Sequence, residues 1–121
     1  MICEFCIKEL PPSYNKHFQV AWALKEMWLS PEAHAFKNRV KMLIPPVEVK
    51  EELLAIDITY TYNFYYKNKK LKKFDTANCD KLLLDAISEG LGIDDSFFKR
   101  RIVKDINSEK EVSTSVKISY L

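Results

Sequence analysis

Residues 54–66 constrain the fold of this chain more than any other segment. Apolar side chains alternate with more polar ones along this segment, which is also rich in β-branched and aromatic residues. This pattern is typical of a β-strand with one face on a core. Successive side chains of a strand point to opposite faces. The members predicted to share the buried face are therefore the even-numbered ones: Leu54, Ile56, Ile58, Tyr60, Tyr62 and Phe64. Such a face needs a second layer of structure to cover it.

A first helix is predicted before this strand. Ser30-Pro31-Glu32 combines a hydroxyl N-cap, a proline at the first helical position and an acid that the helix dipole favours. Apolar residues then recur at helical spacing, and Pro45-Pro46 ends the helix. The buried stripe of this helix is predicted to be Ala33, Phe36, Val40 and Leu43.

A second helix is predicted after the strand and a charged loop, residues 67–73. Asn78 is a plausible N-cap, and Gly90 and Gly92, the only glycines, mark the end of the helix. The predicted core stripe follows the i, i+3, i+4, i+7, i+8 pattern and consists of Cys79, Leu82, Leu83, Ala86 and Ile87.

The remaining segments complete a single domain over residues 1–121. Residues 2–8 are predicted to form a strand, and residues 14–29 suit either a helix or a strand hairpin. Residues 97–106 and 112–120 are predicted to form a β-hairpin. The order β-α-β-α-β-β predicts an α+β fold, with both helices packed on one face of a mixed sheet.

The net charge of +2 shows no overall basic excess, but the basic residues are clustered. Local clusters matter more for DNA binding than the net balance does, and solvated surface is the alternative for each cluster. The first cluster is Lys67, Lys69, Lys70, Lys72 and Lys73, and the second is Lys99, Arg100, Arg101 and Lys104.

Three cysteines, an odd number, argue against a secreted disulfide framework. Cys3 and Cys6 resemble half of a zinc knuckle, but no second pair follows. In a strand these two residues point to opposite faces, which argues against a zinc site that both would share. Buried thiols are the default expectation. No signal peptide or membrane-spanning run is recognised. We therefore expect a cytoplasmic protein that does not engage a membrane.

Carboxylates lie on both sides of the second helix. Asp75 precedes it, and Asp94 and Asp95 follow it. Folding can bring such acids together as hard-cation sites require. Each also has an ordinary alternative: Asp75 could be a helix-dipole partner or turn former, Asp94-Asp95 is a common turn composition, and Lys81 could pair with Asp85 on the helix surface.

Four separated motifs of this chain resemble those of the RusA family of Holliday junction resolvases. The first is Pro11-Pro12-Ser13-Tyr14-Asn15, and the second is the helix start Ser30-Pro31-Glu32 with the residues to Phe36. The third, an Asp-x-Asp-Asn-x-x-Lys motif in the family, is matched by residues 75–81 and is followed by Asp85-Ala86. The fourth is Asp94-Asp95. Their order and spacing agree over nearly the whole chain.

The resemblance implies a dimeric, Mg²⁺-dependent endonuclease (Mn²⁺ is possible) that nicks four-way DNA junctions symmetrically, in a bacterial or phage-infected cell. By position, Asp75 and Asp95 would be metal ligands, with Asp94 as a further candidate, and Lys81 would be a catalytic lysine. Carboxylate-held Mg²⁺ would stabilise the charge that develops during phosphodiester hydrolysis and acidify bound water. The expected DNA contacts are Asn15 and the two basic clusters.

One position and one segment depart from the family pattern. Ala77 replaces the second aspartate of the third motif, and a methyl group cannot bind a cation. Three explanations stay open: an engineered inactivation, a natural variant in which Asp80, Asp94 or water completes the shell, or a protein that binds branched DNA without cutting it. Asp80 itself is expected to be a surface acid at the helix start. The segment between Asn15 and Ser30 is apolar where relatives tend to be basic and to contain glycine, and Trp22 and Trp28 suit core or dimer packing better than base stacking.

Overall fold

The structure, a computed structural model, describes the residues outside 13–17, 22–25, 30 and 74–75; of residues 18–21, 26–29, 77 and 78 it describes the backbone alone. The N-terminal half contains β1 (Cys3–Ile7), β2 (Phe18–Ala21), β3 (Glu26–Leu29) and α1 (Pro31–Leu43). The rest contains β4 (Leu54–Tyr62), α2 (Ala77–Leu91), the 3-10 turn η2 (Asp95–Phe97), β5 (Phe98–Asn107) and β6 (Ser113–Tyr120).

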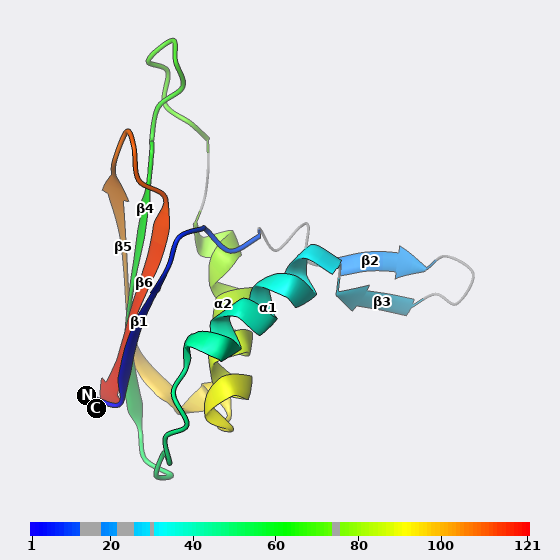
Figure 1. Ribbon diagram of the computed structural model, residues 1–121, viewed down its shortest axis with the longest axis vertical. Coiled ribbons are helices and arrows are strands. Elements are labelled where there is room, and N and C mark those ends of the chain that lie inside the picture. Colours follow the sequence, from blue (N-terminus) through cyan, green and yellow to red (C-terminus); the bar gives the residue numbers. More distant parts are fainter. Residues whose placement is uncertain (13–17, 22–25, 30, 74–75) are drawn as a thin grey trace.

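Four strands form a mixed sheet in the order β1-β6-β4-β5. β6 is antiparallel to both of its neighbours, whereas β4 and β5 are parallel. Both helices lie on one face of this sheet (Figure 1), which confirms the predicted α+β fold. β2 and β3 form a separate antiparallel pair, so the hairpin alternative for residues 14–29 holds over the strands that the structure describes.

The prediction that the last two strands form a β-hairpin was wrong. β4 lies between β5 and β6 and pairs with both of them. Alternation shows that a segment is a strand, but it does not show which strand lies beside it. β4 is buried along most of its length and β5 is exposed beyond Phe98. The strand with the most apolar surface takes a central place, and the polar strand takes the edge.

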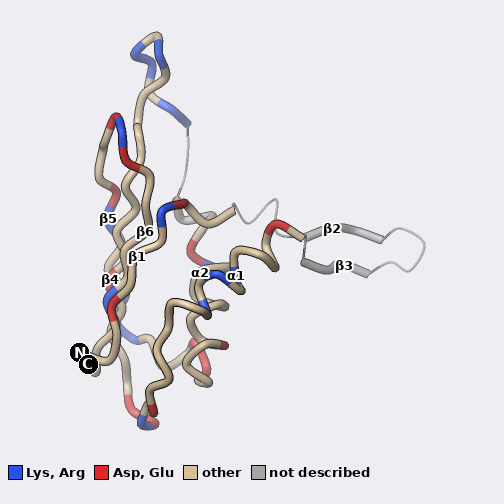
Figure 2. The backbone as a smooth tube through the Cα atoms, viewed as in Figure 1, with Lys and Arg blue, Asp and Glu red and all other residues tan. Residues whose placement is uncertain are grey.

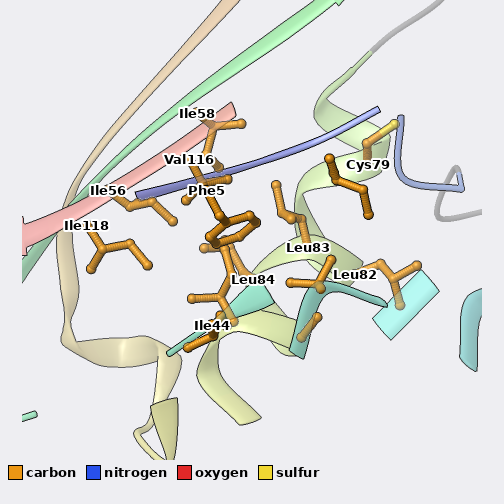
Figure 3. Packing of buried hydrophobic residues seen from close by; sticks show 14 of the residues in the cluster. Phe5, Ile44, Ile56, Ile58, Cys79, Leu82, Leu83, Leu84, Val116 and Ile118 are labelled. Carbon is orange, nitrogen blue, oxygen red and sulfur yellow. The ribbon is translucent and has the colours of Figure 1, made fainter. Parts of the chain in front are cut away.

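The core lies between the sheet and the helices (Figure 3). β4 turns its even-numbered residues inward as predicted, from Leu54 to Tyr62, and Phe64 is partly buried beyond its end. The predicted stripe of α2 is confirmed in full: Cys79, Leu82, Leu83, Ala86 and Ile87 are all buried. Each large apolar side chain buried in this way contributes roughly 1.5–3 kcal/mol of transfer free energy.

One predicted core residue of α1 was wrong. Ala33, Phe36 and Val40 are buried, but Leu43 is 42% exposed and Ile44 is buried in its place. α1 ends at Leu43, so the helical spacing no longer sets the direction of the next side chain. An added Cβ at Gly90 would lie 2.6 Å from Ile44 Cδ1. Glycine at position 90 therefore permits the close approach of α2 to this part of the chain.

An ion cluster joins the two helices at their polar edge. Lys37 Nζ and Lys41 Nζ of α1 each lie 2.6 Å from a carboxylate oxygen of Glu89 in α2. The hydrogen bonds from Lys37 and then Lys41 hold the pKa of Glu89 below its ordinary value. Lys37 is buried, and burying a lysine is tolerated here because its charge has a partner.

The ends of α2 differ in part from the prediction. The helix begins at Ala77 with Thr76 as the N-cap residue, so the assignment of Asn78 as the N-cap was wrong. At the other end Gly92 adopts the left-handed conformation, with φ of 70°, as a glycine C-cap does. Gly90 lies inside the helix.

β4 ends at Tyr62, earlier than predicted, because the chain then leaves the sheet to form a projecting loop.

Candidate active site and nucleic-acid interface

The start of α2 is tied to the sheet by Thr76. Its hydroxyl lies 2.9 and 3.0 Å from the two carboxylate oxygens of Asp105 in β5. Tyr62 in β4 donates to the same carboxylate at 2.8 Å. Thr76 is buried, and its side chain makes no capping hydrogen bond to the helix. A threonine cap is typically worth about 1 kcal/mol, so this hydroxyl serves a bond to another element instead of the usual local bond.

A second tyrosine–aspartate pair lies in the first turn of α2. The hydroxyl of Tyr60 donates to Asp80 Oδ1 at 2.5 Å. Tyr60 is fully buried and Asp80 is half-buried, so the expectation that Asp80 is a surface acid was wrong. Burial and the carboxylate partner raise the pKa of Tyr60 far above its ordinary range, which keeps this hydroxyl a donor. The side chain of Asp80 thus points toward the sheet-facing side of α2, where it meets Tyr60.

The acids beyond α2 form a short turn. Asp94 is exposed, and its Oδ1 accepts a hydrogen bond from Ser96 N at 2.8 Å, which holds the pKa of Asp94 below its ordinary value. The side chain of Arg101 donates to the carbonyl of Asp95 at 3.3 Å and to that of Phe98 at 3.1 Å. The turn-forming alternative for Asp94 therefore holds, and Arg101 braces the turn that carries Asp95.

The predicted catalytic residues fall at opposite ends of α2 within one chain. Ala77 and Lys81 lie in the first two turns of α2, whereas Asp94 and Asp95 come after its last turn. The helix has 15 residues, about 21 Å from end to end at ~1.5 Å per residue. Asp75 lies outside the described residues. Lys81 is exposed and no ion pair joins it to Asp85, two side chains that the structure does describe.

The described part of the chain contains no complete ligand set for a metal cation. No group of three His, Cys, Asp or Glu side chains there lies close enough to hold a metal ion. A shallow pocket at the end of α2 is lined by Asp85, Glu89, Asp94 and Asp95, but Glu89 is already paired with two lysines. The described residues of a single copy therefore form no complete ligand set, and the alanine at position 77 adds no ligand atom.

The first basic cluster lies on an arm that projects beyond the sheet (Figures 1 and 2). This arm, residues 63–73, folds back on itself through a bridge between Tyr65 and Leu71. Its turn places Lys69 at φ of 65°, and the side chain of Asn68 accepts from Lys70 N. The predicted DNA-binding lysines of the arm are exposed or half-exposed: Lys67, Lys69, Lys70, Lys72 and Lys73. Lys72 Nζ also lies 5.7 Å from the centre of the exposed ring of Tyr66.

The second basic cluster is divided between the two faces of the sheet. The register places Arg100 beside Ala55 and Lys104 beside Thr59, odd-numbered positions of β4 that point away from the helices. Lys99 and Arg100 are exposed and remain candidate DNA contacts. Arg101 lies on the helix-facing side and is engaged by backbone carbonyls. Asn15 and Trp22, with the side chain of Trp28, lie outside the described residues.

Sequence reasoning missed Asp105 and the two tyrosine hydroxyls. Asp105 lies 30 positions after Asp75, at no recognised spacing from the motifs. A signal was present in Tyr60 and Tyr62, because a tyrosine on a core-facing position usually finds a hydrogen-bond partner for its hydroxyl. That signal predicts that a partner exists, but it does not identify the partner.

The expectation of buried thiols holds for Cys3 and Cys79 and was wrong for Cys6. Cys3 and Cys79 are buried, Cys6 is exposed, and all three are free. Burial raises the pKa of Cys3.

In the part of the chain that the structure describes, we find no helix with the length and apolar character to cross a membrane.

Fold and surface together define a small α+β domain with a basic arm that projects beyond the sheet and with two acids, Asp94 and Asp95, directly after helix α2. Comparison with protein families identifies this class more closely. The family model described as Endodeoxyribonuclease RusA matches residues 9–119, so the chain belongs to the RusA endodeoxyribonuclease family. A search of curated proteins gave no match.

Proposed function

We propose that this protein is a structure-selective endodeoxyribonuclease that nicks four-way DNA junctions, and that its cleavage is weak because position 77 is alanine. The observation that carries the proposal is the family match over residues 9–119. The matched range spans the positions of Lys81 and of the acids Asp75, Asp94 and Asp95, to which the resemblance assigns catalytic and metal-binding roles.

The charge distribution supports a DNA substrate. The arm presents its lysines on a projection that neighbouring parts of the chain leave open to solvent (Figure 2). Lysines that neutralise phosphates release counterions, so junction binding should weaken steeply as salt increases. A projecting arm can reach a second DNA strand that a flat surface would miss, which suits a branched substrate.

We assign the chemistry to the residues of the third motif. Lys81 is exposed on α2, where its charge could stabilise the negative charge that develops on the phosphate. Mg²⁺, or Mn²⁺, is the proposed cofactor, with Asp75, Asp94 and Asp95 as candidate ligands that two copies of the chain would supply together, because α2 separates the third motif from Asp94 and Asp95 within one copy. The alanine at position 77 has no atom that could bind a cation, and this is our reason for proposing that the chain as written cuts poorly.

A homodimer is part of the proposal. Two identical sites related by a two-fold axis would match the symmetry of a four-way junction and give paired nicks. Sedimentation equilibrium at micromolar concentration tests this assembly directly. A mass of one chain at concentrations that bind the junction would contradict it.

Restoring the carboxylate at position 77 tests the cleavage proposal. A labelled four-way junction is incubated with Mg²⁺ and either the chain as it stands, Ala77→Asp, or Ala77→Asn. The asparagine matches aspartate in size but lacks its charge, so it separates ligand chemistry from bulk. We expect paired symmetric nicks with Ala77→Asp, and at most weak cutting with the other two. No nicking by any of the three folded proteins would overturn the proposed activity.

Ala77 itself favours one alternative, a protein that binds branched DNA without cutting it. Both functions predict selective junction binding over linear duplex of the same sequence. They differ only in the result with Ala77→Asp: tight binding without nicks would identify the binding protein.

A further inference from the structure

The carboxylate of Asp105 joins three elements that are far apart in the sequence. It lies on β5 and accepts hydrogen bonds from Tyr62 at the end of β4 and from Thr76 at the start of α2. Thr76 stands between positions 75 and 77, the first and second aspartate positions of the family motif. The tether therefore acts on the motif itself.

The bond from Thr76 replaces the one that a helix cap normally makes. Thr76 is buried, its backbone is helical, and its hydroxyl is directed to Asp105 and not to the first turn of α2. Both carboxylate oxygens lie within 3.0 Å of that hydroxyl. A charged acceptor makes a stronger hydrogen bond than a neutral one. The local geometry thus favours fixing Thr76 against the sheet over capping the helix.

The same strand braces the other end of the candidate site. Arg101 lies four residues before Asp105, about 13 Å along a strand, and donates to the carbonyl of Asp95. The parallel register puts Arg101 beside Ile56 and Asp105 beside Tyr60, so both side chains belong to the helix-facing side of the sheet. β5 is a largely exposed edge strand, yet its polar residues bond to Thr76 at the start of α2 and to the turn η2 that follows this helix.

We propose that Asp105 is a positioning residue: by holding the Thr76 hydroxyl, it fixes the chain between positions 75 and 77 against the sheet. The inference deepens the nuclease function proposed above and rests on it. A shift of about 1 Å in a catalytic group can cost on the order of 100-fold in rate. Loss of the tether should therefore reduce the rate at saturating junction more than it reduces junction binding.

Three variants in the Ala77→Asp protein separate positioning from general stability. Thr76→Val removes the hydroxyl and keeps the shape, whereas Thr76→Ser keeps the hydroxyl. Tyr62→Phe removes the other donor to the same carboxylate and leaves the Thr76 bond in place. We expect Thr76→Val to lower the nicking rate at saturating junction by about 10- to 100-fold, with the dissociation constant for the junction changed less than threefold. Thr76→Ser should restore the rate, and Tyr62→Phe should stay within about threefold.

Amide hydrogen exchange of the DNA-free protein gives a readout independent of cleavage. We expect Thr76→Val to raise exchange in the first turn of α2 by at least about tenfold while the amides of β6 stay protected. Unchanged exchange there, or equal rate losses in Thr76→Val and Tyr62→Phe, would overturn the positioning role. If the Ala77→Asp parent proves inactive, the nuclease function fails, and the exchange measurement still decides whether Asp105 fixes the motif.

Discussion

Replacing Tyr60 by phenylalanine removes one hydroxyl from the core and leaves the ring in place. Tyr60 is fully buried, and its hydroxyl lies 2.5 Å from Asp80 Oδ1. A hydrogen bond to a charged group contributes about 1.5–3 kcal/mol to stability. Asp80 is half-buried and keeps part of its hydration, so we expect the lower end of this range. The free energy of unfolding should fall by about 1.5 kcal/mol, which corresponds to a decrease in Tm of roughly 6 °C for a domain of this size.

Urea denaturation followed by circular dichroism measures this change, and Tyr62→Phe is the matched control. Tyr62 donates to Asp105, a more exposed carboxylate that also accepts from Thr76. Its loss should therefore cost less, under about 1 kcal/mol. A double-mutant cycle of Tyr60→Phe with Asp80→Ala should give a coupling energy above about 1 kcal/mol. Equal losses in the two tyrosine variants, or no coupling, would refute the argument that the buried pair stabilises the start of α2.

Three further measurements address other parts of the molecule. The lowered pKa of Glu89 means that the unfolded chain binds more protons; unfolding free energy should decline as the pH falls below about 4.5, and Glu89→Gln should flatten that decline in urea melts between pH 6 and 3. For the arm, replacing Lys67 and Lys70 by alanine and Lys69 by glycine, which suits its left-handed turn, should reduce the slope of log Kd against log salt by about 0.9 for each lysine that contacts phosphate. An unchanged slope would exclude the arm as a DNA contact. In thiol titration, Cys6 alone should react rapidly in the folded protein, and three thiols should react in guanidinium; three rapid thiols in the native protein would contradict the observed burial.

Local pattern was enough to predict most elements and their inward faces. Alternation in residues 54–66 predicted which side of β4 is buried, and helical spacing predicted the stripe of α2. These predictions succeed because the direction of a side chain within one strand or helix depends only on the backbone repeat. They fail where the repeat ends, as at Leu43, which was predicted to be buried and is exposed.

The family motifs were likewise recognisable from the sequence, and the match over residues 9–119 confirms the family. The roles of individual motif residues stay predictions, since Asp75 and Asn15 lie outside the described residues. The structure adds a constraint that spacing did not reveal. A 15-residue helix separates Ala77 and Lys81 from Asp94 and Asp95 within one chain, so motifs adjacent in the sequence are not adjacent in space.

The sequence by itself therefore determined the fold class, the faces of β4 and α2, and the family. Only the tertiary structure decided that β4 separates β5 from β6, that Asp80 meets Tyr60, and that Asp105 holds Thr76. The physical reason is the range of the interactions. Backbone periodicity acts over a few neighbouring residues. The hydrogen bonds of Tyr60 and Tyr62 join positions 20 and 43 residues apart, and strand pairing joins positions as distant as Cys3 and Ile118, which only the folded chain brings together.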